Sequence, residues 1–224
     1  MRVRFLALLS IVAVGIPTAA RSETTLTVDP KAGNNAMSAV FDAAIGERIT
    51  AVSSSVGCTV TVDENQLVGH AVCAVPLTSI RVDNDDTKSD HFRQWATNKK
   101  MEPRKCELKL DVPSLKLPAP VEPMKPVAFE TNGTFTICGR PRDDKGPEAI
   151  RGTIVYLPAG AYNDSRTLRI RAKIEGFDRE RYRVGPAFTE GWLARVQQLA
   201  PVVAKEGTIE VNLFAIARDG AAKR

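Results

Sequence analysis

Three segments of the chain alternate strictly between apolar and polar residues. The clearest is 167–175, and the segments 106–112 and 208–215 repeat it. The apolar residues of the first segment are Leu168, Ile170, Ala172 and Ile174. Because successive side chains of a β-strand point to opposite faces, this period of two predicts strands with one buried face and one face in water.

Further strand candidates occur along most of the remaining chain. They are residues 37–45, 49–53, 58–62, 67–80, 127–138 and 152–157. About eight strands with few helical patterns between them indicate an antiparallel all-β domain. The proline-rich segment 113–126 lies between two of these strands, so we interpret it as a long hairpin loop and not as a domain linker.

Two short segments have helical spacing. Residues 88–100 carry Phe92 and Trp95 on one side, and residues 190–199 place Trp192, with Leu193 and Val196, at helical intervals. The two helices either plug the end of the sheet or barrel as part of its core, or form a lid over a ligand. The spacing does not distinguish these two roles.

The first residues have the pattern of a secretory signal peptide. Arg2 and Arg4 precede a largely apolar run over 5–16, and small residues follow. A run of this length is too short for a bilayer, which needs about 20 residues, and no second long apolar run follows. We expect cleavage after Ala20 or Ser22, which divides the chain into a signal peptide, 1–22, and one β domain, 23–224.

The positive charge is modest and partly belongs to the signal peptide. The full chain has 31 Lys and Arg against 26 Asp and Glu, a formal charge of +5. Cleavage after Ala20 leaves 29 basic residues, or +3. A basic excess of this size, without the aromatic residues that a nucleic-acid surface interleaves with its cations, predicts no nucleic-acid partner.

The four cysteines form an even set, which in a secreted chain favours disulfides. Cys58 and Cys73 are equidistant from the turn expected at positions 65 and 66, and Cys106 and Cys138 are equidistant from position 122. We therefore prefer the pairs 58–73 and 106–138 among the three connectivities. Cys138 is out of phase with the apolar positions of its strand, so the second pair requires a β-bulge.

The residues that most enzymes need are scarce. The chain has two histidines, His70 and His91, and it lacks phosphate-loop, nucleophile-elbow and zinc motifs. The run with Asp83, Asp85 and Asp86 lacks the glycine and the terminal glutamate of a calcium loop, so we interpret it as a solvated acidic turn. Asp90 beside His91 is better explained as a polar pair at a helix N-terminus than as a hydrolase site. We expect no enzyme, no metal site and no cofactor.

Five landmarks follow one another in a recognisable order. They are Ser38 to Phe41 (SAVF), 75–82 (VPLTSIRV), the polar turn and helix at 84–95, 133–139 (GTFTICG) and 179–184 (RERYRV). Their order resembles that of the YceI-like family over residues 36–216. The resemblance implies a lipocalin-like antiparallel β-barrel of about eight strands with one or two short helices, secreted to the bacterial periplasm, that holds an isoprenoid-type lipid or a quinone.

The candidate ligand contacts are the apolar residues on the inner face of the expected strands. These are Phe41, Leu110, Phe129, Phe135, Leu168, Ile170 and Ile174. A barrel of about eight strands is either filled by its side chains or holds one small ligand. The sequence therefore leaves two functions open: a non-enzymatic carrier of a hydrophobic small molecule, or a secreted structural or protein-interaction domain with a filled core.

Overall fold

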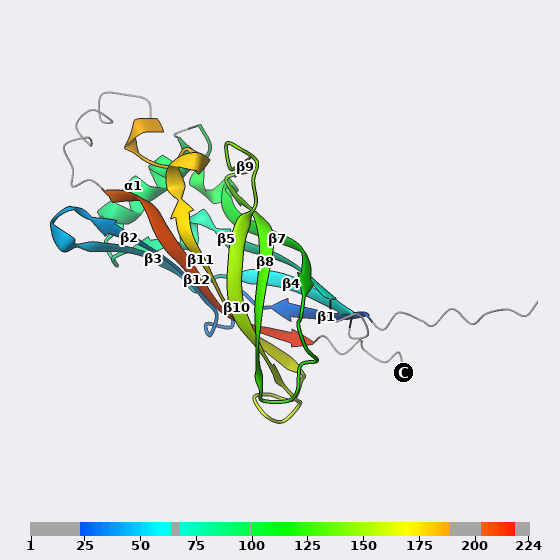
Figure 1. The fold of residues 1–224 in the computed structure, drawn as a ribbon. Coiled ribbons are helices and arrows are strands. Elements are labelled where there is room, and N and C mark those ends of the chain that lie inside the picture. Colours follow the sequence, from blue (N-terminus) through cyan, green and yellow to red (C-terminus); the bar gives the residue numbers. More distant parts are fainter. Residues whose placement is uncertain (1–22, 64–67, 99, 189–202, 218–224) are drawn as a thin grey trace, which may run out of the picture.

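The computed structural model describes residues 23–63, 68–98, 100–188 and 203–217, which form one sheet of twelve strands and a short helix (Figure 1). The helix is α1 (Asp86–Thr97). The strands are β1 (Glu23–Val28), β2 (Ala36–Ala43), β3 (Arg48–Ser53), β4 (Gly57–Asp63), β5 (Val68–Pro76), β6 (Arg81–Val82), β7 (Glu107–Lys116), β8 (Pro126–Ile137), β9 (Arg140–Pro141), β10 (Glu148–Leu157), β11 (Thr167–Asp178) and β12 (Val203–Ala217).

The sheet closes into an eight-stranded antiparallel barrel, as expected. Around the barrel the order is β1, β4, β5, β7, β8, β10, β11 and β12, and the last strand pairs with the first. In that closing pair Leu26 lies opposite Ala217. Beyond it, β12 pairs with β2, and β3 and β6 extend the sheet towards α1. The fold is lipocalin-like.

Along one edge, β12 pairs first with β2 and then with β1. A buried asparagine lies between these two ladders. The ladder with β2 ends at Asn212, and the ladder with β1 includes Ile216. Between them the side chain of Asn35 accepts a hydrogen bond from the Phe214 N–H at 2.9 Å and donates one to the Asp29 carbonyl at 3.0 Å. A buried backbone N–H must be paired, so Asn35 replaces the missing strand at this point.

Most of the expected strands are confirmed, and the main error is an omission. Residues 167–175 lie in β11, 106–112 largely in β7 and 208–215 in β12. We did not predict β1, although Leu26 and Val28 alternate there and are buried. The segment 67–80 is not one strand, because a short 3-10 helix, Leu77–Ser79, follows β5.

The proline-rich segment is a hairpin connection, but its loop is shorter than we predicted. β7 continues through Pro113 to Lys116. The register between β5 and β7 shifts where Pro113 and Ser114 lie, between the Gly69–Leu115 and Ala71–Val112 pairs. A proline has no N–H to donate to the ladder, which is why it is accommodated at an irregularity.

The expected helix near residues 88–100 is α1. Asp85 caps it by accepting a hydrogen bond from the Lys88 N–H at 2.9 Å, and Asn98 ends it in the left-handed conformation, with φ of 51°. Phe92 and Trp95 pack against the barrel core, so this helix is a plug and not a lid. The other predicted helix, 190–199, and the signal peptide, 1–22, lie outside the described residues.

Both predicted disulfides are present, 58–73 and 106–138. Cys58 lies directly opposite Cys73 in the β4–β5 hairpin. The bulge that we expected for the second pair is absent, because β7 and β8 stay in register up to the Leu108–Ile137 pair. Cys138 instead has a left-handed backbone, with φ of 50°. That conformation turns its side chain back towards Cys106.

Candidate functional site

A cavity of about 370 Å³ lies inside the barrel. This volume is within the range of small-molecule pockets, about 300–1,000 Å³. Each barrel strand contributes at least one side chain to the wall, such as Leu26, Val60, Ala71, Val112, Phe129, Ile154, Leu168 and Leu213. The interior of the described barrel is therefore not filled by side chains.

The walls are apolar because the inward positions of each strand are apolar. The polar residues in the lining include Thr24, His70, Tyr156 and Arg166. They belong to β1, β5, β10 and the residue preceding β11, near the strand ends opposite α1, and His70 and Arg166 are exposed. Among the described residues this part of the wall reaches solvent, so we call this end, where β1 and β11 begin, the open end of the barrel. A ligand entering there would place its apolar part inside and its polar part near these side chains.

Small inward residues create the space. Gly69, Ala71 and Ala172 line the cavity, and Gly152 lies beneath the ring of Phe129, which lines it. At Gly152 a Cβ atom would lie 2.6 Å from Cζ of Phe129, which is too close for any real side chain. Because Gly152 has no side chain, the Phe129 ring packs directly against this strand, and a larger residue would displace the ring.

The structure brings six of the seven candidate ligand residues together. Leu110, Phe129, Leu168 and Ile170 line the main cavity. Leu110 also lines a second hollow of about 50 Å³, together with Phe135 and Ile174. This smaller hollow lies deeper in the barrel, towards α1.

Phe41 does not reach either space among the described residues. It lies on β2 opposite Gly207, in the part of the sheet that extends beyond the closed barrel. A Cβ atom at Gly207 would lie 2.5 Å from Cδ1 of Phe41. The aromatic ring thus covers a glycine in the neighbouring strand. Phe41 occupies an apolar position of its strand because it packs there, and not because it lines the cavity.

Several wall residues were missed at the sequence level. Val60, Ala71 and Ile154 share the inward alternation of their strands, so the same pattern identifies them once each strand is extended to its full length. Tyr156 follows that alternation on β10, but a tyrosine is not distinguishable there from an exposed edge residue. No periodic signal places Arg166, because it precedes its strand.

The end of the barrel near α1 is closed by three aromatic rings, which we call the aromatic floor: Phe135, Phe177 and Tyr182. Phe135 meets Phe177 edge-on at 5.1 Å and Tyr182 edge-on at 5.6 Å between ring centroids. Phe177 and Tyr182 are stacked at 4.9 Å. All three are nearly inaccessible to solvent, and such pairs stabilise beyond their buried area.

A polar network holds Tyr182 in place. Its hydroxyl donates a hydrogen bond of 2.6 Å to the buried carboxylate of Glu148, which also lies 3.4 Å from Arg142. Burial raises the pKa of Tyr182 well above its usual value, and the bond to Glu148 adds to this. Next in the network, the Arg142 guanidinium holds the pKa of the Asp144 carboxyl well below its usual range.

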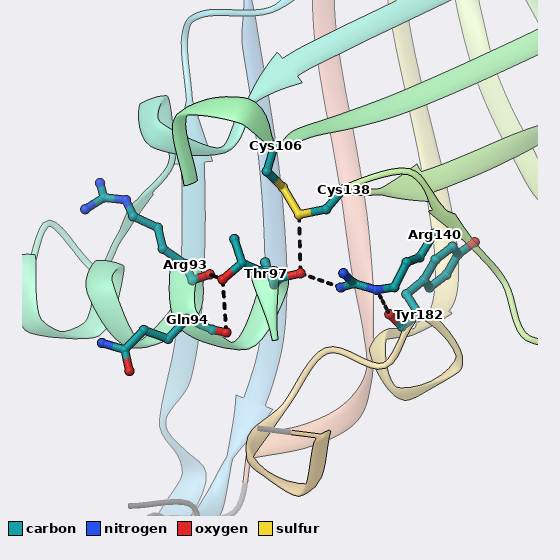
Figure 2. Close-up of a disulfide and its surroundings, with 8 residues drawn as sticks. Arg93, Gln94, Thr97, Cys106, Cys138, Arg140 and Tyr182 are labelled. Carbon is teal, nitrogen blue, oxygen red and sulfur yellow. Dashed lines mark hydrogen bonds between the residues drawn. A yellow bond between two sulfur atoms is a disulfide. The ribbon is translucent and has the colours of Figure 1, made fainter. Parts of the chain in front are cut away.

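The same end is tied to α1, as Figure 2 shows. Arg140 donates hydrogen bonds to the carbonyl oxygens of Ala96 and Tyr182, the latter at 3.2 Å. Cys138 Sγ lies 3.3 Å from the Ala96 carbonyl, beside the bridge to Cys106. Burial lowers the pKa of Arg140. These contacts join the helix to β8, β9 and the Tyr182 turn.

The acidic residues considered for catalysis or calcium binding have structural partners. Asp90 forms an ion pair of 2.6 Å with Arg93, one turn further along α1. Asp83 accepts a hydrogen bond from the Thr50 N–H and pairs with Lys88, while Asp85 caps the helix. Within the described ranges, no group of three His, Cys, Asp or Glu side chains is arranged to hold a metal ion.

No helix in the part of the chain that the structure describes is long and apolar enough to cross a membrane.

Comparison with known proteins shows a structural likeness without a sequence match. No known protein-family model and no curated protein matches the chain. Among solved structures, it is similar to a polyisoprenoid-binding domain from Saccharophagus degradans implicated in plant cell wall breakdown. The two are 13% identical, with a TM-score of 0.60 over 87% of this chain and 99% of that chain. The likeness confirms the fold that the five landmarks implied, a lipocalin-like barrel shared with a polyisoprenoid-binding domain.

Proposed function

We propose that this protein binds or carries an isoprenoid-type lipid, a quinone or another hydrophobic small molecule inside its barrel, and that it is not an enzyme. The observation that carries the proposal is the apolar cavity of about 370 Å³ surrounded by all barrel strands. The solved barrel of the same fold is described as polyisoprenoid-binding, which supports an elongated apolar ligand.

The energetics of such binding are favourable. Burying an apolar tail gains about 0.8 kcal/mol per CH₂ group, so a tail of about twelve carbons gains about 10 kcal/mol. Association costs about 4–15 kcal/mol in lost translational and rotational freedom. Apolar burial is therefore comparable in size to this cost, and contacts at the open end would add affinity and specificity for the polar part of the ligand.

The proposal places the protein in an oxidising compartment outside the cytoplasm. Its four cysteines form two disulfides, which are stable in the periplasm and rare in the cytosol. The signal-peptide pattern over 1–22 agrees with this location, leaving 23–224 as the mature domain. We propose a periplasmic carrier, because a hydrophobic molecule needs a protein to cross that aqueous space.

The alternative, a structural or protein-interaction domain with a filled core, has less support. The cavity removes its main premise. This alternative assigns the partner contacts to the loops 113–126 and 140–150. The second loop is largely engaged within the molecule, since Arg142 and Asp144 belong to the network that holds Tyr182.

A direct test extracts the natively purified protein with organic solvent and identifies the released lipid by mass spectrometry. Uptake of a short-tailed quinone by the emptied protein is then titrated. Ala71→Phe places a ring in the cavity, and Val72→Phe, the matched control, adds the same ring on the opposite face of β5. We expect at least tenfold weaker uptake for Ala71→Phe and little change for Val72→Phe.

Two results would overturn the proposal. One is a protein that is repeatedly empty and shows no saturable uptake of any quinone or polyprenyl probe. The other is equal uptake by both variants, provided that circular dichroism and thermal unfolding show both to be folded.

A further inference from the structure

We propose that the ligand enters and leaves the barrel sideways, between β7 and β8, past an apolar segment of residues 117–121 that covers this part of the wall. The inference rests on the proposed function and adds to it the route of the ligand. It follows from a ladder that stops partway along two neighbouring strands, and from the side chains that close the wall where the ladder is missing.

β7 and β8 pair over only part of their length. Their ladder ends at the pair Asp111–Thr134, although β7 continues through 112–116 and β8 includes 126–133. On their other sides both strands remain paired along these stretches, β7 with β5 and β8 with β10. We call the unpaired stretch between 112–116 and 126–133 the seam.

Pro113 explains why the ladder stops. The Cys138 N–H donates a hydrogen bond to the Glu107 carbonyl at 2.9 Å, and hydrogen-bonded pairs alternate along an antiparallel ladder. In this register, residue 113 is the next residue of β7 after Asp111 that would exchange hydrogen bonds with β8. Since a proline has no N–H to donate, the sequence itself prevents the ladder from continuing.

The backbone of β8 therefore faces the seam without a strand partner. The even-numbered residues of β8 direct their N–H and C=O groups to β7, as Thr134 does, and the odd-numbered residues direct theirs to β10. Within 107–137, where every residue is described, one hydrogen bond crosses the seam, from Thr131 Oγ1 to the Ser114 carbonyl at 2.9 Å. The even-numbered residues beyond the ladder are Ala128, Glu130 and Asn132.

Side chains close the wall at the seam. Leu115, Leu117, Pro120 and Val121 line the main cavity, and they belong to the end of β7 and the segment that follows it. We call residues 117–121 the gate. In the part of the chain that the structure describes, the gate forms no hydrogen bond. Its leucine and its valine pack against the core, so apolar contact holds it in place.

The gate is attached at both ends. It follows β7 directly, and beyond it the Met124 N–H donates a hydrogen bond to the Tyr156 carbonyl at 2.9 Å, while Lys125 pairs with Glu122 at 2.5 Å. Apolar attraction is not directional, so the gate can move outward and return without breaking a hydrogen bond. Opening a paired part of the wall would instead break the bonds of a ladder.

The first experiment fastens the seam. Ser114→Cys and Asn132→Cys place two thiols on exposed positions at its two sides, and the four natural cysteines are already bridged. A short bismaleimide links the new thiols, and the same variant capped with N-ethylmaleimide is the unlinked control. Linking Glu130→Cys to Arg151→Cys, which lie opposite each other in the intact β8–β10 ladder, is the matched control.

Rapid mixing with a short-tailed quinone measures the rates of binding and release. We expect the link across the seam to slow both rates at least tenfold and to leave the dissociation constant within twofold, because a route affects passage and not the bound state. Both controls should keep the rates of the natural protein within twofold. Unchanged rates in the linked protein would overturn the inference and place the route at the open end. Failure of the natural protein to bind the quinone would instead refute the proposed function.

A second experiment loosens the gate. Leu117→Ala and Leu168→Ala remove the same side chain from two parts of the cavity lining. We expect binding to become at least threefold faster with Leu117→Ala alone, because Leu117 belongs to the gate and Leu168 to β11. Leu168→Ala should change the rate of release. Equal rates of binding in the two variants would contradict a route past the gate.

Hydrogen exchange tests the seam without a ligand, and therefore independently of the proposed function. Along one strand, the amides that face the seam should exchange at least tenfold faster than those that bond to β10. The first set is Ala128, Glu130 and Asn132, and the second is Val127, Phe129 and Thr131. Equal protection of the two sets would show that the seam is paired in solution and would remove the basis of the inference.

Discussion

The two ends of the barrel are built from the same strands but have opposite interiors. Towards α1 the inward positions carry Phe135 and Phe177, which pack with Tyr182 into a closed floor. Towards the open end the inward positions include Gly69 and Ala71, which line the cavity. A barrel of this size can be either packed or hollow, and here the sizes of the inward side chains make it both.

The polar groups differ between the two ends as well. At the closed end the largely buried guanidinium of Arg179 donates hydrogen bonds to the carbonyls of Val184, Val203 and Ala204, at 2.7, 2.9 and 3.1 Å. Burial lowers the pKa of this arginine. At the open end, His70 lies 3.1 Å from Asp111, and both side chains are nearly half-exposed. The guanidinium of Arg179 is thus hydrogen-bonded within the molecule, whereas His70 and Asp111 at the open end lie at the surface.

The largest expected difference between the ends is in stability. Leu77 is fully buried near α1, so Leu77→Ala should reduce the free energy of unfolding by about 3–5 kcal/mol. Leu168 already faces the cavity, so Leu168→Ala should cost only about 1–2 kcal/mol. Urea unfolding of both variants measures the two losses. Equal losses would mean that the open end is as tightly packed as the closed end.

The two disulfides provide the next comparison. Replacing both members of the pair 106–138 with alanine should cost about 4 kcal/mol, and replacing the pair 58–73 about 3 kcal/mol, because the first closes the longer loop. The two disulfides should differ more clearly in their effect on ligand affinity. Cys73 lines the cavity, so only removal of the 58–73 pair should alter quinone binding in titrations below the unfolding temperature. A binding defect confined to the other pair would reverse the assignment of the two ends.

The smallest effect is a dependence on alkaline pH at the closed end. The raised pKa of Tyr182 means that the folded protein keeps the phenol proton after the unfolded chain has lost it. The contribution of Tyr182 is therefore complete below pH about 10 and decreases above it, by about 1.4 kcal/mol per pH unit. Tyr182→Phe should be less stable at neutral pH, since Glu148 loses a partner, but should lack this slope. Denaturant unfolding of both proteins between pH 9 and 11 measures how the free energy of unfolding changes with pH. Equal slopes would show that Tyr182 does not titrate in this way.

Local pattern predicted much of the fold. Alternation identified the strand around Ile170, and the symmetric spacing of Cys58 and Cys73 identified their bridge. The alternating pattern predicted the structure less well wherever the backbone departs from regular geometry. The direction of the Cys138 side chain depends on the left-handed backbone of that residue, and the continuation of β7 through Pro113 depends on a register shift. Such features arise from neighbouring strands, which a periodic pattern does not contain.

The candidate site was predictable by face but not by depth. Leu110, Leu168 and Ile170 have the inward phase and line the cavity. Phe41 also has the apolar phase of its strand, yet it covers Gly207 outside the cavity. The phase of the alternation predicts which side of the sheet a residue faces. The position of that residue along the barrel axis depends on strand tilt and register, which are set by the other strands.

The sequence by itself determined the all-β class, the apolar faces and the disulfide pairs, because each depends on spacing within the chain. Only the tertiary structure decided that the interior is hollow, which end is open and where the floor lies. The reason is volume. Whether space remains depends on how inward residues of neighbouring strands pack on one another, as Phe129 packs on Gly152, and no single strand carries that information.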